Sequence, residues 1–556
     1  MRRHVGALLL ACTLPVWIVS TAVATQLLRH QLGVQDSSAR WWDVIRYWSL
    51  WRHPALQPFH VELAWSLMLV LCPAVLCLTI GVAVLRRPST TRNLYGRSRF
   101  ASRREIRRLG LINPPGASIL FGQIGRSRVG FPGQKFMILA APTRSGKGVG
   151  IVIPNLLHFC DSAVVLDIKG ENFDLTSGWR QQIGHAVFRF NPFASDARTH
   201  RWNPFGYVSH EPDRRIAELS AIAAMLYPDG EPQNKFWIGQ ARNAFLALSM
   251  YLFDRQDRFE EFDHGHSYAP TIGMIYRLSL GDGDDLRSTL RGMVEESFVR
   301  DRTRAAMNGL LSQAPDTFAS ILGTFREPLN AWVDPILDAA TSVNDFDLRQ
   351  LRRTRMTIYV VIPPHRLAEA KLIVNLFFSQ VLNLNTQQLP SQDPSLKYQC
   401  LLLMDEFTSI GKVEIIAHAV SYMAGYNIRL MPIIQSVAQL DAVYGKELAR
   451  TLITNHAAQV IFAPREQQDA KDYSEMLGDR SVTKRTRNRG KDSTTSESEE
   501  RRALMLPQEL KAMGPDHAIV LIEGSASPLK LRKLRYYADP EFKRRLLPAI
   551  TVPALY

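Results

Sequence analysis

The sequence predicts an α/β fold with a parallel sheet, an inserted all-helical domain and a preceding two-helix transmembrane hairpin. Three observations support this prediction. Two long uncharged runs occur before residue 86. Short apolar runs typical of buried parallel strands then form two groups along the chain. The segment between these groups, residues 213–347, has helical periodicity instead. At 556 residues the chain is long enough for more than one domain.

The N-terminal region contains two candidate membrane spans, residues 5–28 and 63–85, which carry no charged side chain. Each is long enough to cross a hydrocarbon core of about 30 Å as a helix. Nine arginines lie between residues 86 and 108, against one acid, whereas arginines between the two runs are fewer and are offset by acids. The positive-inside rule therefore predicts two spans with both termini in the cytoplasm. A cleaved signal peptide ending near Ala22 or Ala24 is the alternative for the first run.

The formal charge of +15 and the pI near 9.7 favour an anionic partner, either nucleic acid or lipid headgroups. The arginines that follow the second run supply more than half of this excess. The charge is therefore weak evidence for nucleic-acid binding.

The five cysteines show neither a metal-binding spacing nor a disulfide framework, which suits a reducing compartment.

A phosphate-binding loop is predicted between residues 136 and 154. An apolar strand, 136–140, enters a turn of small residues, and Lys147 begins a helix that Pro154 interrupts. Backbone N–H groups and one ammonium would converge beyond the strand end, as G-x-x-x-x-G-K-[ST] loops require. The predicted nucleotide-binding residues are Ala141, Pro142, Thr143, Arg144, Ser145, Gly146, Lys147, Gly148 and Val149.

Two positions depart from this motif. Ala141 stands where the first glycine belongs, and Gly148 replaces the hydroxyl that binds Mg²⁺. Water or the Ser145 side chain is left to complete the metal shell. An ordinary strand-turn-helix is the alternative interpretation of the loop.

Acidic and amide side chains follow two later strands. The apolar run 401–404 ends in Asp405 and Glu406, which would hold Mg²⁺ through water and polarise the attacking water, respectively. Strand 428–434 ends in Gln435, which could sense a γ-phosphate, although Ser436 could simply cap the next helix. The strand at 162–168 ends in Asp167, at the edge of the sheet where ligands bind, and a satisfied loop aspartate is the alternative interpretation. Together with the loop, the two acids predict nucleotide hydrolysis.

The predicted organisation has four parts. The hairpin occupies residues 1–86, and a juxtamembrane linker with the first part of the nucleotide-binding domain occupies 87–210. The all-helical domain covers 211–350. The second part of the nucleotide-binding domain covers 351–556 and includes a mobile excursion at 479–502, which has no apolar period.

The motifs together resemble the type IV secretion coupling proteins. They are Ala-Pro-Thr-Arg-Ser-Gly-Lys-Gly-Val-Gly at 141–150, Val-Leu-Asp-Ile-Lys-Gly-Glu at 165–171, Leu-Leu-Met-Asp-Glu-Phe at 402–407, Gln-Ser-Val-Ala-Gln-Leu at 435–440 and Tyr-Tyr-Ala-Asp-Pro-Glu-Phe at 536–542. The resemblance implies a RecA-like P-loop ATPase of the bacterial inner membrane, with a helical cap, that assembles as a homo-hexamer.

The resemblance also implies site roles and partners. Lys147 would bind phosphates, Asp405 would serve Mg²⁺, Glu406 would activate water and Gln435 would sense the γ-phosphate of ATP. Arg429, Arg450 and Arg465 are candidates for an arginine that completes a neighbouring subunit's site. The partners would be secretion-channel components, and the cargo would be protein substrates, relaxase-bound single-stranded DNA, or both. A membrane-anchored translocase of duplex DNA and a non-catalytic nucleotide-binding scaffold are the alternatives.

Overall fold

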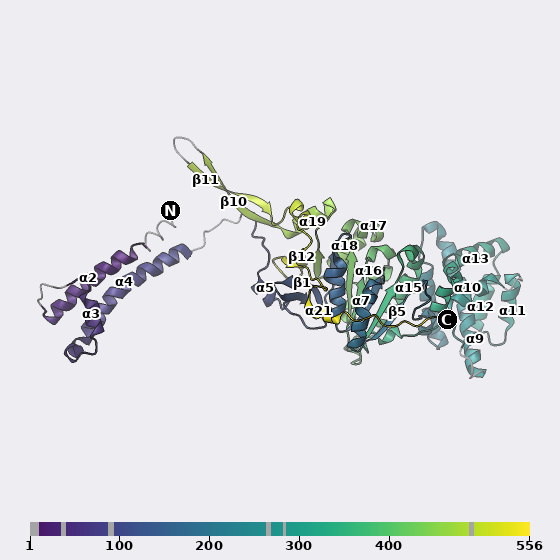
Figure 1. The fold of residues 1–556 in the computed structure, drawn as a ribbon. Helices are drawn as coiled ribbons and strands as arrows, with labels where there is room; N and C mark the ends of the chain where they lie inside the picture. Colours follow the sequence, from purple (N-terminus) through teal and green to yellow (C-terminus); the bar gives the residue numbers. More distant parts are fainter. Residues whose placement is uncertain (1–10, 35–39, 87–93, 263–267, 282–284, 489–493) are drawn as a thin grey trace. The chain divides into compact units, whose positions relative to one another are not determined.

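The structure is a computed structural model that describes residues 11–34, 40–86, 94–262, 268–281, 285–488 and 494–556 (Figure 1). The chain divides into two compact units, Met1–Asn93 and Leu94–Tyr556. Each unit has its own hydrophobic core. The predicted membrane hairpin and α/β region therefore correspond to separate units.

The first unit is a helical hairpin. Helix α2 (Thr13–Leu32) packs along α4 (His60–Arg86), and the short α3 (Asp43–Ser49) lies between them in sequence. Among the described residues, two helical stretches are long and apolar enough to cross a membrane, Pro54–Ala83 and Pro364–Asn385. More than half of the second is buried within the other unit, which makes it a core helix. The second predicted span lies within α4, whereas residues 5–10 of the first lie outside the described residues.

An eleven-stranded sheet organises the second unit, in the order β2-β1-β13-β12-β9-β3-β8-β7-β4-β6-β5. Neighbours from β9 to β5 are parallel, and those from β2 to β9 are antiparallel. The carboxyl ends of the parallel strands therefore meet at one edge. The strands are β1 (Ile119–Ile124), β2 (Ser127–Phe131), β3 (Met137–Ala140), β4 (Ser162–Asp167), β5 (Ala186–Phe190), β6 (Met356–Val361), β7 (Cys400–Met404), β8 (Ile428–Ile434), β9 (Ala458–Ile461), β12 (His517–Ile522) and β13 (Leu529–Arg532).

Helices cover both faces of this sheet, so that the parallel strands β3, β4, β6, β7 and β8 are buried throughout. The covering and flanking helices are α5 (Arg103–Arg108), α6 (Ile153–His158), α7 (Glu171–Gln182), α15 (Leu367–Asn385), α16 (Glu414–Ala419), α17 (Val437–Tyr444), α18 (Lys446–Thr454), α19 (Gln467–Leu477), α20 (Pro507–Lys511) and α21 (Pro540–Arg545).

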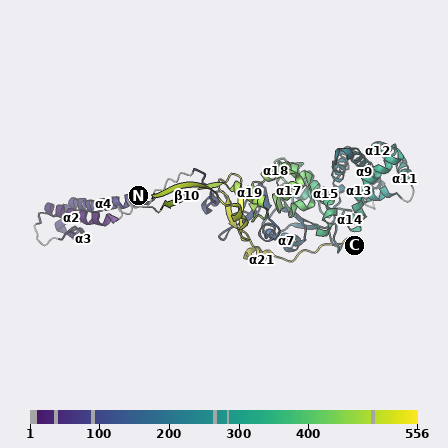
Figure 2. The same cartoon turned by 90° about the horizontal axis from the view of Figure 1, so that it is seen from above.

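A helical region is inserted between β5 and β6, and it lies at one end of the second unit (Figures 1 and 2). Its apolar stripes pack α9 against α8, α12 and α13. The predicted fold class, an α/β domain with an all-helical insertion after an apolar hairpin, is confirmed. The inserted helices are α8 (Pro212–Leu226), α9 (Lys235–Phe262), α10 (Ile272–Leu280), α11 (Leu286–Glu295), α12 (Asp301–Leu311), α13 (Pro315–Leu329) and α14 (Pro335–Ala340).

Two elements differ from the prediction. The excursion at 479–502 contains a regular antiparallel hairpin of β10 (Asp479–Asn488) and β11 (Thr494–Ala503). Pro154 does not interrupt its helix, because a π-helical turn, Gly148–Val152, leads directly into α6 and places the proline in the first α-turn. A missing N–H is tolerated at that position.

Candidate functional site

The phosphate loop lies at the carboxyl end of β3, where the sequence predicts it. Arg144 and Gly146 have φ angles of 59° and 84°, which turn the chain back into the π-helical turn. The loop N–H groups of Thr143, Arg144 and Gly146 donate no hydrogen bond within the described part of the chain. A bend with free N–H groups at a helix start is a ready site for a phosphate.

Lys147 lies between the two acids that follow β7. Its Nζ is 3.0 Å from Asp405 Oδ1 and forms a short ion pair with Glu406 Oε1. The three side chains are 15–21% exposed. Glu406 has a φ of 57°, a strained value for a residue other than glycine, and strain of this kind is common at functional sites. The structure thus brings the predicted lysine and both predicted acids together.

Gln435 connects the acids to the loop. Its Nε2 donates to Glu406 Oε2 at 2.9 Å, and its Oε1 accepts from Thr143 Oγ1 at 3.0 Å. Burial acts to raise the pKa of Glu406, but the hydrogen bonds from Lys147 and Gln435 outweigh it and hold this pKa below its usual range. Glu406 is therefore ionised at neutral pH. Ser436 caps α17, because its side chain accepts a hydrogen bond from the N–H of Gln439. The capping that the sequence predicts is therefore confirmed, and Gln435 makes its contacts with Glu406 and Thr143 in addition.

Asp167 is a satisfied loop aspartate. Its carboxylate accepts from the N–H groups of Lys169, Gly170 and Phe173 at 2.9–3.3 Å. Burial, aided by the charge of Asp405, raises its pKa to about 7. These bonds fix the turn after β4, and we assign Asp167 no further role.

The residues around the loop fit a nucleotide with a divalent cation. Ser145 Oγ and Asp405 Oδ1 are buried and lack a hydrogen-bond partner among the described residues. Asp405 Oδ1 forms an ion pair with the Lys147 ammonium, but the angles of this contact are not those of a hydrogen bond. A Cβ added at Gly148 would meet no atom within 4 Å, so the loop has open space beside it. Oxygen ligands next to open space are the donor set that Mg²⁺ prefers.

The three candidate arginines separate by burial. Arg429 is fully buried at the amino end of β8, where its guanidinium donates to the carbonyls of Lys135, Ala117 and Phe131. Its pKa falls to about 9 because of burial. A neighbouring subunit cannot reach this side chain, so Arg429 is the wrong candidate. Arg450 and Arg465 are exposed and stay as predictions.

No sequence motif marks Lys533, which follows β13. Its Nζ donates to the carbonyl of Ser145 at 3.1 Å and lies 3.5 Å from the ring centroid of Phe462. Four cationic residues lie close together in this segment, and only the fold shows which of them contacts the loop.

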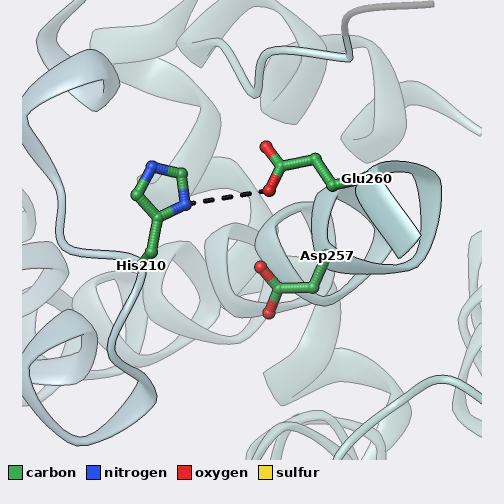
Figure 3. A group of neighbouring side chains, drawn as sticks. All are labelled: His210, Asp257 and Glu260. Atoms are coloured by element: carbon green, nitrogen blue, oxygen red, sulfur yellow. Dashed lines mark ion pairs between the residues drawn. The ribbon is translucent and has the colours of Figure 1, made fainter. Parts of the chain in front are cut away.

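A separate group of possible metal ligands, His210, Asp257 and Glu260, lies in the helical insertion (Figure 3). Asp257 already forms ion pairs with Arg215 at 3.0 Å and with Arg300 at 2.7 Å. These two cations compensate its charge and oppose a metal ion, so we assign this group no metal.

Comparison with known proteins establishes the family. The family described as type IV secretory system conjugative DNA transfer matches residues 99–555. The chain belongs to this family. The expected membership of the type IV secretion coupling proteins is thereby confirmed, and the family's name associates the chain with conjugative DNA transfer.

Among characterised members of the family, the chain is 34% identical over 418 residues to Protein VirD4 of Agrobacterium fabrum (strain C58 / ATCC 33970), covering 74% of this chain and 60% of that protein. It is 26% identical over 447 residues to conjugal transfer protein TraG of Escherichia coli, covering 73% and 68%. The chain therefore spans about 60% of the length of the VirD4 protein.

Solved coupling proteins share this fold. The bacterial conjugative coupling protein TrwBdeltaN70 superposes with a TM-score of 0.56 at 18% identity, covering 81% of this chain and 96% of that one. TrwB in complex with ADP and Mg²⁺ gives 0.54 at 17%, covering 81% and 97%. At this identity, the likeness establishes the fold alone.

Proposed function

We propose that the chain is a membrane-anchored ATPase that couples substrates to a type IV secretion channel. The observation that carries this proposal is the position of Lys147, at the end of a phosphate loop where the helix begins and in contact with Asp405 and Glu406. A lysine in such a loop with two acids at the end of a nearby parallel strand is the arrangement that P-loop hydrolases use.

Each site residue has a role in this proposal. The free N–H groups of the loop and the Lys147 ammonium bind the phosphates of ATP. Asp405, through water, and the unpartnered hydroxyl of Ser145 are the groups that would hold Mg²⁺. When bound, Mg²⁺ neutralises charge on the phosphate oxygens. Glu406 orients and polarises the attacking water, and Gln435 senses the γ-phosphate.

The ion pair between Lys147 and Glu406 suggests how binding prepares the site. Phosphates compete with the carboxylates for the Lys147 ammonium, because they carry more charge than Glu406 does. Release from Lys147 frees one carboxylate oxygen of Glu406, while Gln435 continues to hold the other. The general base is then fixed in position and able to accept a proton.

The remaining parts of the proposal concern assembly and cargo. We propose a homo-hexamer in which Arg450 or Arg465 completes a neighbouring site. Both termini lie on the cytoplasmic side of a bacterial inner membrane that the two N-terminal helices span. The helical insertion binds the cargo, which consists of protein substrates, relaxase-bound single-stranded DNA, or both.

Phosphate release from ATP by the full-length chain in lipid nanodiscs tests the motor. Lys147→Ala should lower the rate at least about a hundredfold, and Glu406→Gln should do so while nucleotide binding is retained. Lys530→Met, which removes an exposed lysine on β13, is the control and should keep the wild-type rate. A wild-type rate no higher than that of Lys147→Ala overturns the ATPase and favours the scaffold.

A further inference from the structure

We propose that Lys533 is a positioning residue of the phosphate loop: its buried ammonium binds the Ser145 carbonyl and adds positive charge beside the nucleotide phosphates. This inference rests on the proposed nucleotide site. It adds a residue from the antiparallel part of the sheet to a site otherwise built from the ends of parallel strands.

The first support is the close fit of Lys533 between three elements. Its backbone N–H donates to the carbonyl of Asp516 at 2.8 Å, which fixes the chain just beyond β13. Its ammonium lies 3.5 Å from the ring centroid of Phe462, which follows β9. The residue is only 8% exposed, so few other positions are open to the side chain. The backbone and the ammonium of Lys533 are therefore both fixed in position, and the 3.1 Å hydrogen bond to the Ser145 carbonyl is fixed with them.

The second support is the packing of the helical turn after the loop. A Cβ added at Gly150 would lie 3.3 Å from the Leu534 carbonyl oxygen and 3.6 Å from Lys533 Cβ. The turn Gly148–Val152 thus packs directly against the chain at 533–534. The contact to Ser145 and this packing fix both ends of the Gly146–Lys147 bend.

The third support is electrostatic. Lys147 is balanced by two carboxylates, whereas no acid within the described residues lies within ion-pair distance of Lys533. Burial lowers the pKa of Lys533 to about 8 against the opposing charge of Asp516, so most of the ammonium stays protonated at neutral pH, and Asp516 is itself paired with Arg535. Lys533 therefore contributes uncompensated positive charge to a buried region that adjoins the loop. Charge of this kind is poorly screened and favours an anionic ligand.

The cost of this arrangement points to a role beyond packing. A buried ammonium without a carboxylate is unfavourable, and a methionine would fill the same space against Phe462 without that cost. Lys533→Met therefore separates the two roles. Loss of a packing residue would lower the melting temperature, whereas loss of a positioning charge would weaken nucleotide binding in a protein that still folds.

The test compares Lys533→Met, Lys533→Arg and the exposed control Lys530→Met in the full-length chain in nanodiscs. Calorimetric titration with ADP should show about a tenfold weaker Kd for Lys533→Met, the effect of one charge-assisted contact. Lys533→Arg should recover most of the affinity, since a guanidinium retains the charge and stacks on the ring of Phe462. Lys530→Met should match the wild type.

Hydrogen exchange without nucleotide supplies a second readout. The Ser145 amide, which donates to the Pro142 carbonyl, and the Gly150 amide, which donates to the Gly146 carbonyl, should exchange faster in Lys533→Met and at the wild-type rate in Lys530→Met. Phe462→Leu retains the lysine and removes the ring, and it should give a smaller change in the same direction. This second variant decides the matter if Lys533→Met does not fold.

The outcomes separate this inference from the ATPase proposal. Equal ADP affinity and equal exchange in wild type and Lys533→Met overturn the role of Lys533, whatever the rate of hydrolysis. Weaker ADP binding by Lys533→Met in a chain that never hydrolyses ATP supports Lys533 and overturns the motor. A wild-type chain that does not bind ADP overturns both.

Discussion

Gln435 joins the two strand ends that carry the site, because its amide contacts Glu406 through Nε2 and Thr143 through Oε1. We expect Gln435→Ala to lower kcat by about 10- to 100-fold, since Glu406 loses the group that orients it. Nucleotide affinity should change less than about threefold, since Lys147 and the backbone N–H groups of the loop do not contact Gln435.

Steady-state kinetics and ADP titration measure the two quantities separately. Gln439→Ala is the matched control. This exposed amide lies four residues after Gln435 and makes only a long contact with Gln435 Oε1, at 3.5 Å. A proportional loss of kcat and affinity in Gln435→Ala would contradict the role assigned to this side chain.

Buried histidines predict sensitivity to acid. Burial lowers the pKa of His456 to about 4, and its Nε2 has no partner among the described residues. Between pH 6.5 and 4 the unfolded chain therefore binds a proton at His456 that the native chain does not. The free energy of unfolding should fall on acidification through this window, by up to about 1.4 kcal/mol per pH unit from this residue.

Denaturant unfolding of the second unit across this pH range measures the slope. His456→Phe should reduce the slope by about one proton, whereas His418→Phe, at an exposed position on α16, should leave it as in the wild type. An unchanged slope in His456→Phe would show that this histidine is protonated in the native protein.

At the scale of residues, the sequence identifies the groups that lie at strand ends and misses those that depend on tertiary packing. Lys147, Asp405 and Glu406 follow directly from apolar runs that end in polar residues. Arg429 and Lys533 could not be separated from exposed cations, because burial depends on which strands become neighbours. Lys533 reaches Ser145 across 388 positions of sequence.

Among the elements, α7 packs against the C-terminal segment with very little clearance. A Cβ at Gly178 would clash with the Pro548 carbonyl oxygen and lie 3.0 Å from Leu547 Cβ. We expect Gly178→Ala to lower the free energy of unfolding by about 1–3 kcal/mol, or to release residues 547–555 from the surface. Denaturant unfolding and hydrogen exchange distinguish these two effects.

Gly239→Ala is the matched control on α9. Its added methyl meets no atom within 4 Å, and alanine favours a helix over glycine, so stability should rise by about 0.5–1 kcal/mol. If Gly178→Ala is stabilised like Gly239→Ala, the close contact with the C-terminal segment does not exist in solution.

Elements whose apolar residues have a clear period are predictable, and others are not. The strands β3, β4, β6, β7 and β8 are buried on both faces and appear as continuous apolar runs. Strand β5 does not appear as such a run, because its Arg189 and its exposed first residue interrupt the apolar pattern. The hairpin β10–β11 has no hydropathy signal, because ladder hydrogen bonds hold two polar strands together without an apolar face.

At the scale of the whole molecule, the sequence predicts a helical hairpin apart from the α/β region but not how the strands are ordered within the sheet. Strands β9, β12 and β13 lie more than 300 residues after β3 and β1, yet they are placed between these two strands. Hydropathy cannot reveal this order, since any buried strand could occupy those positions. The order is what brings Phe462 and Lys533 beside the phosphate loop.

Residues 94–98, the first of the second unit, form hydrogen bonds with the hairpin β10–β11. These bonds attach the start of this unit to the hairpin. Ser98 N donates to the Asp479 carbonyl and Ser481 N donates to the Gly96 carbonyl, both at 3.1 Å. Ser98→Pro removes the first donor, whereas Ser98→Ala retains it. We expect the Ser481 amide to exchange at least about tenfold faster in the proline variant, because an opened pair exposes its N–H to water. Hydrogen exchange on the full-length chain in nanodiscs measures this rate, and equal rates in the two variants would mean that residues 94–98 are not held by the hairpin.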